Sequence, residues 1–326
     1  MTAWQGRSVL VTGAAGFLGQ HLVVRLLKLG AKILALDLKP PEPCLFELRG
    51  SLRNNPRLTW VHGSFLDQAT LSAATQDCSV LFHMACTLLP ASSNEDIERD
   101  LRENLIGSIG LFQAFAKSRA HAPDSGRRIV IPSSGGTIYG VPRSLPVTEN
   151  HGTEPLCSYG VVKLALEKYL EIFESLYGVS YAALRISNPF GPGQQPKPGH
   201  GVIPNFIYAA LHDKPIEIWG DGSTVRDYLY VEDVITALIL AADQPKSLVL
   251  NIGSGSGLSL NEIYRAIELA IGRPVQVVYK DRRSVDVPVN VLDSKRAAIV
   301  LGWKPLQPFD SGLAKTIDWI KSLGAH

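Results

Sequence analysis

The chain lacks a strong charge bias and a long apolar run, and each absence excludes a class of partner. Its 326 residues carry 32 Lys and Arg against 30 Asp and Glu, a formal net charge of +2. This balance does not indicate a basic surface for nucleic acid or an anionic membrane. No run of about 18 apolar residues marks a membrane span. We therefore expect a small-molecule substrate.

Cysteine is also scarce, and its spacing matches neither a disulfide scaffold nor a metal site. The four cysteines show no CxxC or Cys/His ligand spacing, so we expect no bound metal and a reducing compartment. The start, from Met1 to Arg7, lacks the apolar region of a signal peptide. These observations predict a cytoplasmic protein. The cysteines are Cys44, Cys78, Cys86 and Cys157.

Short β-branched runs alternate with segments of helical period over the first 190 residues. This alternation is typical of βαβ units and predicts an α/β fold with a doubly wound parallel sheet of the Rossmann type. The expected strands are Ser8–Val11, Lys32–Leu36, Leu58–Val61, Val80–His83, Arg128–Ile131 and Tyr181–Ile186. The expected helices are Phe17–Leu29, Ile97–Ala116 and Tyr159–Tyr177.

A glycine-rich turn, TGAAGFLG at 12–19, joins the first predicted strand to an apolar helix. Its glycines permit a tight turn, close approach of a pyrophosphate and tight packing of helix on strand, and a helix N-terminus favours negative charge. The spacing is GxxGxxG rather than GxGxxG, but the strand-turn-helix context predicts a dinucleotide site. The candidate residues are Gly13, Ala15, Gly16, Phe17, Leu18 and Gly19.

A carboxylate, Asp37, ends the next predicted strand 18 residues after Gly19. This is close to the spacing at which an acid bonds the ribose 2′-hydroxyl of a dinucleotide. A carboxylate there repels a 2′-phosphate and favours NAD over NADP, although Lys39 weakens that inference. The alternative is that Asp37 is only a turn residue at the strand end.

Prolines and glycines cluster from Pro189 to Gly201, which predicts a long loop and a change of organisation. We expect a dinucleotide-binding Rossmann domain at 1–188. Residues 189–326 are expected to form mainly a smaller C-terminal α/β lobe that binds the substrate, with some chain returning to the sheet. Its expected elements are helices near Ile203–Leu211, after Val231 and Ser259 and near Ser294 and Gly312, and a strand near Tyr228–Val231.

Tyr159 and Lys163 lie four residues apart on a predicted helix and therefore share a face. A nearby ammonium favours tyrosinate, and the positive ring of bound NAD adds to this effect. We therefore expect the pKa of the phenol to fall from its usual value of about 10. Tyr159 is then a candidate general base. YxxxK alone is usually a solvated helix face, so its weight depends on the other motifs.

Six motifs in order resemble the extended short-chain dehydrogenase/reductases, and more narrowly the NAD-dependent epimerase/dehydratase family that acts on nucleotide sugars. They span almost the whole chain. The resemblance implies NAD as cofactor and a nucleotide sugar, such as a UDP-sugar, as substrate. The motifs are TGAAGFLG (12–19), Asp37, SSGGTIYG (133–140), SYGVVK (158–163), NPFGPGQ (188–194) and RDYLYVEDV (226–234).

The resemblance also implies roles for residues on the cofactor side. Tyr159 and Lys163 become the catalytic pair, and Lys163 also reaches the nicotinamide ribose. Asp67 matches the acid that contacts adenine, with Leu66 as its apolar neighbour. For Asn104 a structural role is the alternative. The remaining matches are Ala85, Asn104 and Ser133.

One position departs from the family. Counted back from Tyr139-Gly140, the usual catalytic Ser or Thr is Gly135 in this chain. Ser134 or Thr137 then supplies the hydroxyl, with Ser134 favoured, or Tyr159 works without one. The alternative for Ser134 is that it does not take part in catalysis and is a strand-end residue packed near the cofactor.

On the substrate side, the resemblance places Arg226 and Arg283 at the diphosphate, where a guanidinium bonds phosphate oxygens in pairs. The alternative is that Arg283 is only a solvated member of a charged run. Asn290 stands where some family members have a bulky tyrosine, so an N-acetylated sugar is expected to fit. The full set of matches is Asn188, Val202, Arg226, Arg283, Asp286 and Asn290.

Epimerisation at C4 through a 4-keto sugar is the expected reaction, with NAD retained between turnovers. A 4,6-dehydratase is less favoured because Gly136-Thr137 replaces its usual Asp-Glu pair. A uronic-acid epimerase or decarboxylase, a 4-keto reductase and a catalytically idle NAD-binding scaffold or sensor stay open. Two predicted helices, Ile97–Ala116 and Tyr159–Tyr177, have apolar residues beyond one stripe. In the family these helices form a dimer interface, so we expect a homodimer. The resemblance also implies polysaccharide synthesis as the pathway.

Overall fold

The computed structural model describes residues 3–39, 55–118, 126–197, 199, 201–281 and 287–323. The chain forms two compact units, each assembled from three segments. The first unit comprises Met1–Ser134, Cys157–Leu184 and Ile235–Leu250, and the second comprises Gly135–Leu156, Arg185–Val234 and Asn251–His326. The chain thus passes between the units several times. Binding of cofactor by one unit and of substrate by the other stays a prediction.

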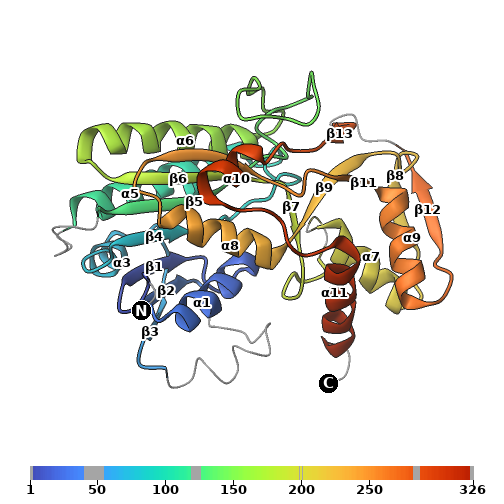
Figure 1. Cartoon of the computed structure of the whole chain (residues 1–326), viewed down its shortest axis with the longest axis horizontal. Coiled ribbons are helices and arrows are strands. Elements are labelled where there is room, and N and C mark those ends of the chain that lie inside the picture. Colours follow the sequence, from blue (N-terminus) through green and yellow to red (C-terminus); the bar gives the residue numbers. More distant parts are fainter. Residues whose placement is uncertain are drawn as a thin grey trace. The chain divides into compact units, whose positions relative to one another are not determined.

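A seven-stranded sheet has the order β10-β6-β5-β4-β1-β2-β3 (Figure 1). This order confirms the predicted doubly wound sheet, because the chain runs outward from β1 to β3 and then in the opposite direction from β4. Ligands of such sheets bind at the carboxyl ends of the two strands where the direction reverses, which are β1 and β4. The strands are β1 (Ser8–Thr12), β2 (Lys32–Asp37), β3 (Leu58–His62), β4 (Val80–His83), β5 (Arg128–Ser134), β6 (Ser180–Ile186) and β10 (Leu248–Ile252).

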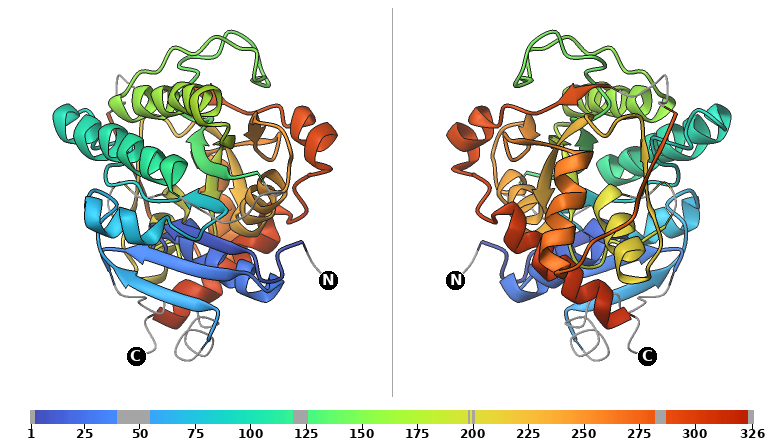
Figure 2. Two further views of the ribbon diagram at one scale, coloured as in Figure 1. Left: turned by 90° about the vertical axis from the view of Figure 1, so that its left-hand side faces the viewer. Right: turned by 90° about the vertical axis from the view of Figure 1, so that its right-hand side faces the viewer.

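Helices cover the sheet because their apolar residues recur every three or four positions. Leu111, Phe112 and Phe115 of α5 pack with Leu10 and Leu81 of the sheet. Figure 2 shows the layer formed by α3, α5 and α6 on the face opposite α1. The helices are α1 (Phe17–Leu29), α3 (Gln68–Ala74), α4 (Ile97–Asp100), α5 (Gly107–Lys117), α6 (Ser158–Tyr177) and α8 (Val231–Ala242).

The helix predicted over Ile97–Ala116 differs in its middle. Residues Leu101–Ile106 form a π-helix, η1, between α4 and α5. A π-helical turn holds one extra residue, so it changes which side chains face the core, and such turns are frequent at functional sites. Asn104 lies in this turn and is buried.

In the second unit, β9 (Val225–Tyr230) is the centre of a small sheet. It pairs in parallel with β7 (Asn188–Phe190) and β13 (Val289–Asn290), and antiparallel with β11 (Gly257–Ser259). The strand expected near Tyr228–Val231 is β9, which begins earlier, at Val225, and ends at Tyr230, because Val231 begins α8. The other elements are β8 (Ile216–Trp219), β12 (Val277–Lys280), α7 (Val202–Leu211), α9 (Leu260–Ile271), α10 (Lys295–Leu301) and α11 (Phe309–Leu323).

Among the helices that the structure describes, none is long and apolar enough to cross a bilayer.

Candidate functional site

The glycine turn packs so closely that side chains are excluded from it. Gly13 has a φ of 66°, and a Cβ on it would lie 2.5 Å from the backbone nitrogen of Ala85. A Cβ on Gly19 would lie 2.1 Å from the carbonyl oxygen of Gly13. Glycine therefore lets the end of β4, the turn and the start of α1 meet at the switch point of the sheet.

The N-terminus of α1 has the properties of a pyrophosphate site. Gly16 is its N-cap residue and offers no side-chain cap, and the first turn carries no acidic residue. The first N–H groups of a helix lack partners within the helix, and they attract anions. Phe17, Leu18 and Gly19 form this first turn. The residues at this end of α1 thus fit the diphosphate of a dinucleotide.

Asp37 holds the glycine turn in place. Its Oδ2 accepts a hydrogen bond from the backbone N–H of Ala15 at 2.9 Å, and its Oδ1 accepts one from Lys39 at 3.0 Å. Each carboxylate oxygen has a second lone pair, so these bonds leave capacity for a ribose hydroxyl. The contact with the ribose stays a prediction.

Asp67, the acid expected to contact adenine, also caps a helix. Asp67 is the N-cap of α3, where its Oδ2 accepts hydrogen bonds from the backbone N–H and the hydroxyl of Thr70. These bonds favour the carboxylate and lower its pKa. The neighbouring Leu66 is 43% exposed. Asp67 and Leu66 are accessible to a ligand, and their contacts with adenine stay predictions.

Two further residues expected on the cofactor side are bonded within the protein. Asn104 accepts a hydrogen bond from the N–H of Thr87 at 2.9 Å and donates one to Asp100 at 2.7 Å. Ser133 donates to Glu167 of α6 at 2.6 Å. Asn104 and Ser133 therefore both have structural roles, and direct contact of either with NAD stays a prediction.

Tyr159 and Lys163 face one another on the first turns of α6. The Lys163 ammonium lies 5.4 Å from the centroid of the Tyr159 ring, and Lys163 is only 5% exposed. The expected low pKa of Tyr159 was wrong for the protein alone. Burial raises this pKa well above its usual value, and the neighbouring acidic groups, among them Asp100, raise it further. Desolvation of the phenolate outweighs the attraction of the ammonium.

Gly135 is the position where the family has its catalytic hydroxyl, and the structure gives a reason for the glycine. A Cβ there would lie 2.4 Å from Cδ1 of Leu292 and 3.1 Å from the carbonyl oxygen of Arg185. Leu292 fills the space that a Ser or Thr side chain would need.

Ser134 and Thr137 are the two candidate substitutes for that hydroxyl. The Ser134 side chain is partly exposed, and the Thr137 hydroxyl is buried; neither makes a hydrogen bond within the described residues. The choice between them stays open.

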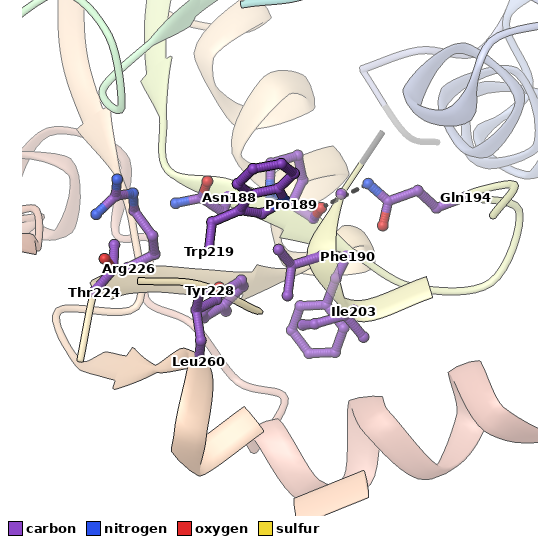
Figure 3. A pocket seen from close by; sticks show the side chains of 12 residues that line it. Asn188, Pro189, Phe190, Gln194, Ile203, Trp219, Thr224, Arg226, Tyr228 and Leu260 are labelled. Carbon is purple, nitrogen blue, oxygen red and sulfur yellow. Dashed lines mark hydrogen bonds between the residues drawn. The ribbon is translucent and has the colours of Figure 1, made fainter. Parts of the chain in front are cut away.

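The second unit contains a cavity of about 350 Å³ that brings together three of the predicted substrate residues: Asn188, Val202 and Arg226 (Figure 3). The Arg226 guanidinium donates to the backbone oxygens of Val225 and Val287, which fixes its position. Asn188 donates to the carbonyl oxygen of Asp227 at 3.0 Å.

Sequence reasoning missed Trp219, one of the three aromatic residues that line this cavity. Trp219 lies in the cavity wall at the end of β8 and is 38% exposed, whereas the neighbouring Ile218 is buried. The alternation of Ile216 to Trp219 carries the signal, because Ile216 and Ile218 are buried and the large aromatic side chain of Trp219 takes an outward position of the strand.

Of the remaining predicted substrate residues, Asn290 lies among the described residues. Asn290 is only 1% exposed; it lies beside Arg226 in the ladder of β13 and β9 and donates to the carbonyl oxygen of Gly135 at 3.2 Å. Arg283 and Asp286 lie outside the described residues.

Known proteins resemble this chain over almost its whole length. The chain is 33% identical over 315 residues to the UDP-glucose 4-epimerase of Mycolicibacterium smegmatis, covering 96% of this chain and 98% of that protein. It is 29% identical over 320 residues to the dTDP-4-dehydro-6-deoxyglucose reductase of Escherichia coli, covering 96% and 97%. The structure of the UDP-glucose 4-epimerase of Thermotoga maritima, solved with UDP-glucose, superposes with a TM-score of 0.88 at 31% identity, covering 97% and 99%.

The model of the NAD dependent epimerase/dehydratase family matches residues 9–253. The match runs from β1 to the loop after β10 and thus includes the glycine turn, the Tyr159–Lys163 pair and the strands of the second unit that carry Asn188 and Arg226. NAD is therefore the cofactor, and the chain belongs to the NAD dependent epimerase/dehydratase family.

Proposed function

We propose that the chain is an NAD-dependent nucleotide-sugar 4-epimerase that acts on a UDP-hexose or a UDP-N-acetylhexosamine through a 4-keto sugar. The observation that carries the proposal is the Tyr159–Lys163 pair on α6 in a chain that matches UDP-glucose 4-epimerases over nearly its full length. The homologous reductase is matched over the same length, so the pair alone does not choose between epimerase and reductase.

Bound NAD would supply the acceptor and the donor of the sugar's C4 hydrogen. Tyr159 acts as the phenolate, which Lys163 stabilises; it removes the proton of the C4 hydroxyl and becomes the neutral phenol. Because burial raises the pKa of Tyr159 in the protein alone, the base depends on added positive charge from the cofactor. The N-terminus of α1 holds the cofactor diphosphate. After the 4-keto sugar turns over, Tyr159 returns the proton.

The cavity of the second unit supports a nucleotide-sugar substrate. Arg226 offers a permanently charged fork to a diphosphate, and the exposed face of Trp219 offers a stacking surface for a nucleobase. The expectation that an N-acetylated sugar fits rests on Asn290 in place of a bulky tyrosine and stays a prediction, because Asn290 is buried and is not among the residues that line this cavity.

A 4-keto reductase is the second candidate. It is favoured by the similarity to the dTDP-4-dehydro-6-deoxyglucose reductase. A reductase consumes a reduced cofactor in each turnover, whereas an epimerase needs none added.

The test is to incubate the purified protein with UDP-glucose or UDP-N-acetylglucosamine, without added cofactor, and to follow the sugar signals by NMR. We expect the galacto epimer with the wild type and none with Tyr159→Phe. Turnover of a 4-keto sugar only in the presence of added reduced cofactor would instead identify a reductase.

A homodimer stays a prediction. Three exposed apolar residues of α6 support it: Val161 at 47%, Ile172 at 49% and Leu176 at 67% exposure. Large apolar side chains that share one helix are typical of a surface that another chain covers. Sedimentation of a monomer at micromolar concentration would contradict the prediction.

A further inference from the structure

The N-terminus of α6 is not capped by its own sequence. Cys157 is the N-cap residue, and its side chain makes no capping hydrogen bond. Two residues of the loop after β4 replace it: the N–H of Ser158 donates to the Asn94 side chain at 2.8 Å, and the N–H of Tyr159 donates to the Ser93 hydroxyl at 3.1 Å. The backbone of the proposed base is thus held by a distant segment.

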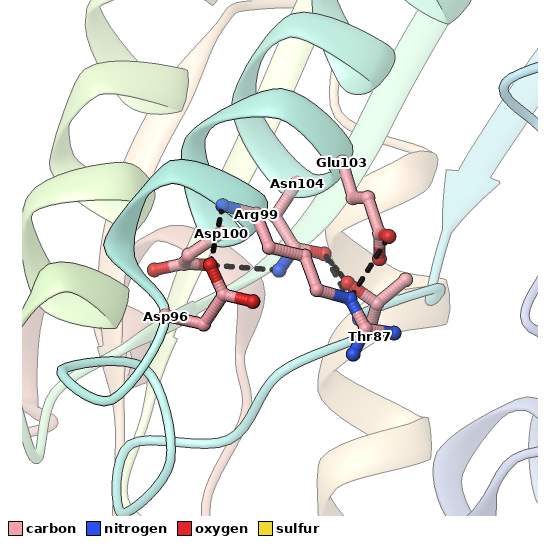
Figure 4. Close-up of polar contacts among 6 residues, drawn as sticks. All are labelled: Thr87, Asp96, Arg99, Asp100, Glu103 and Asn104. Atoms are coloured by element: carbon pink, nitrogen blue, oxygen red, sulfur yellow. Dashed lines mark hydrogen bonds and ion pairs between the residues drawn. The ribbon is translucent and has the colours of Figure 1, made fainter.

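A buried carboxylate, Asp100, makes a second connection between the first turn of α6 and the segment that follows β4. Asp100, at the end of α4, is 0% exposed. Its Oδ2 accepts a hydrogen bond from the Ser158 hydroxyl at 2.6 Å, and its Oδ1 accepts one from Asn104 at 2.7 Å. Asn104 in turn accepts from the N–H and the hydroxyl of Thr87. Figure 4 shows Asp100, Asn104 and Thr87 in this chain of contacts.

A buried carboxylate without a cation is costly, so its retention needs an explanation. Within the described part of the chain, Asp100 makes no ion pair, and its two bonds come from neutral side chains. By contrast, Glu103, on the same helical segment, is partly exposed and paired with Arg99. Asp100 therefore contributes geometry rather than charge neutralisation.

We propose that Asp100 is a positioning residue for Tyr159, which with Asn104 and Ser158 ties the first turn of α6 to the loop after β4. The proposal rests on the role of Tyr159 in the proposed function. The loop contains Ala85, which lies beside the glycine turn, so the tie links Tyr159 to the segment that borders the cofactor site. Displacement of the base by a fraction of an ångström reduces the rate of proton transfer.

The charge of Asp100 gives the proposal a second readout. Four charged or titratable groups act on Tyr159: Lys163 from the next turn of α6, Cys157 before it, Cys86 after β4, and Asp100. Asp100 raises the pKa of Tyr159. Loss of its charge therefore lowers this pKa and shifts the acid limb of kcat, where Tyr159 must be deprotonated, to lower pH.

The experiment compares NAD-loaded variants by the pH dependence of kcat. Ser158→Ala breaks the tie but keeps the charge, so we expect kcat to fall about tenfold or more without a shift of the acid limb. Ser158→Thr keeps the hydroxyl and restores kcat. Asp100→Asn moves the acid limb to lower pH. The matched control, Glu103→Gln, changes neither quantity.

Wild-type kcat in Ser158→Ala, together with a wild-type acid limb in Asp100→Asn, would overturn the proposal. If Asp100→Asn does not fold, the comparison of Ser158→Ala with Ser158→Thr decides. Tyrosinate absorbance of the NAD-loaded protein, corrected with Tyr159→Phe, needs no substrate. A lower titration pH of Tyr159 in Asp100→Asn supports the proposal even if no nucleotide sugar is converted. Failure of the proposed function is therefore distinguishable from failure of this proposal.

Discussion

In the first unit, the glycine turn, Asp37 and the Tyr159–Lys163 pair lie at the ends of long elements whose patterns are visible in the sequence. In the second unit, the cavity is lined by residues of β7, β8 and β9 and by the starts of α7 and α9, which are far apart along the chain. Hydrogen bonds order the first site before any ligand binds. The difference suggests that substitutions in the first unit change the rate of the chemical step, whereas those in the second change substrate binding.

Among the tests of this division of roles between the two units, Tyr159→Phe is expected to have the largest effect. General acid–base catalysis by one residue contributes about 10²- to 10⁴-fold, so we expect kcat to fall by about that factor while the affinity for NAD is retained. Steady-state kinetics and NAD titration measure the two quantities. A kcat that falls less than tenfold would remove Tyr159 from the role of base.

Gly135→Ser restores the family's hydroxyl in the second unit, but Leu292 already occupies its space. We expect the free energy of unfolding to fall by about 1–3 kcal/mol, because overpacking forces neighbours out of place. Urea denaturation measures the change. Gly126→Ser is the control, since an added Cβ there would meet nothing within 4 Å.

Leu292→Ala sharpens this test. The double variant Gly135→Ser/Leu292→Ala should be more stable than the sum of the two single changes by about 1 kcal/mol, because the small residue makes room for the serine. Simple additivity would contradict the account of Gly135.

Arg226→Lys addresses the cavity of the second unit. A lysine keeps the charge but loses the planar fork, so we expect KM for the nucleotide sugar to rise about tenfold with a smaller change in kcat. Arg265→Lys, at an exposed position, serves as the control. An effect on kcat alone would contradict the expectation that substitutions in the second unit change substrate binding.

A further test concerns the acid stability of the first unit. His83 is buried between the hydroxyls of Thr12 and Ser108, at 2.7 and 2.8 Å, and burial lowers its pKa from 6.5 to about 3. Between these values the unfolded chain binds the proton and the folded chain does not. The free energy of unfolding therefore falls as pH drops from 6.5 towards 3, by at most about 1.4 kcal/mol per pH unit from this group.

Chemical denaturation at a series of pH values measures this slope. His83→Gln cannot titrate in this range, so the slope should become flatter in the variant. An unchanged slope would assign the acid sensitivity to other groups.

The sequence predicted the first unit better than the second for a physical reason. Strands and helices such as Ser8–Thr12 and Phe17–Leu29 have strong periodic patterns, so their positions were predicted to within a few residues. The β7 and β13 strands have three and two residues, too few for a pattern, and both depend on pairing with β9.

The pKa of Tyr159 shows another limit of sequence reasoning. The spacing of Tyr159 and Lys163 predicts their contact, but the desolvation that dominates the pKa depends on how the whole unit packs around the phenol. The same holds for the contact of Leu292 with Gly135, which joins residues more than 150 positions apart. Neither effect has a local signature.

The most direct test of the central claim uses UDP-glucose that carries deuterium at C4, incubated with the protein in the absence of added cofactor. Epimerisation by retained NAD predicts UDP-galactose with the deuterium still at C4 and no label in the solvent. Loss of the label to water, or conversion only with added reduced cofactor, would contradict the assignment as a 4-epimerase.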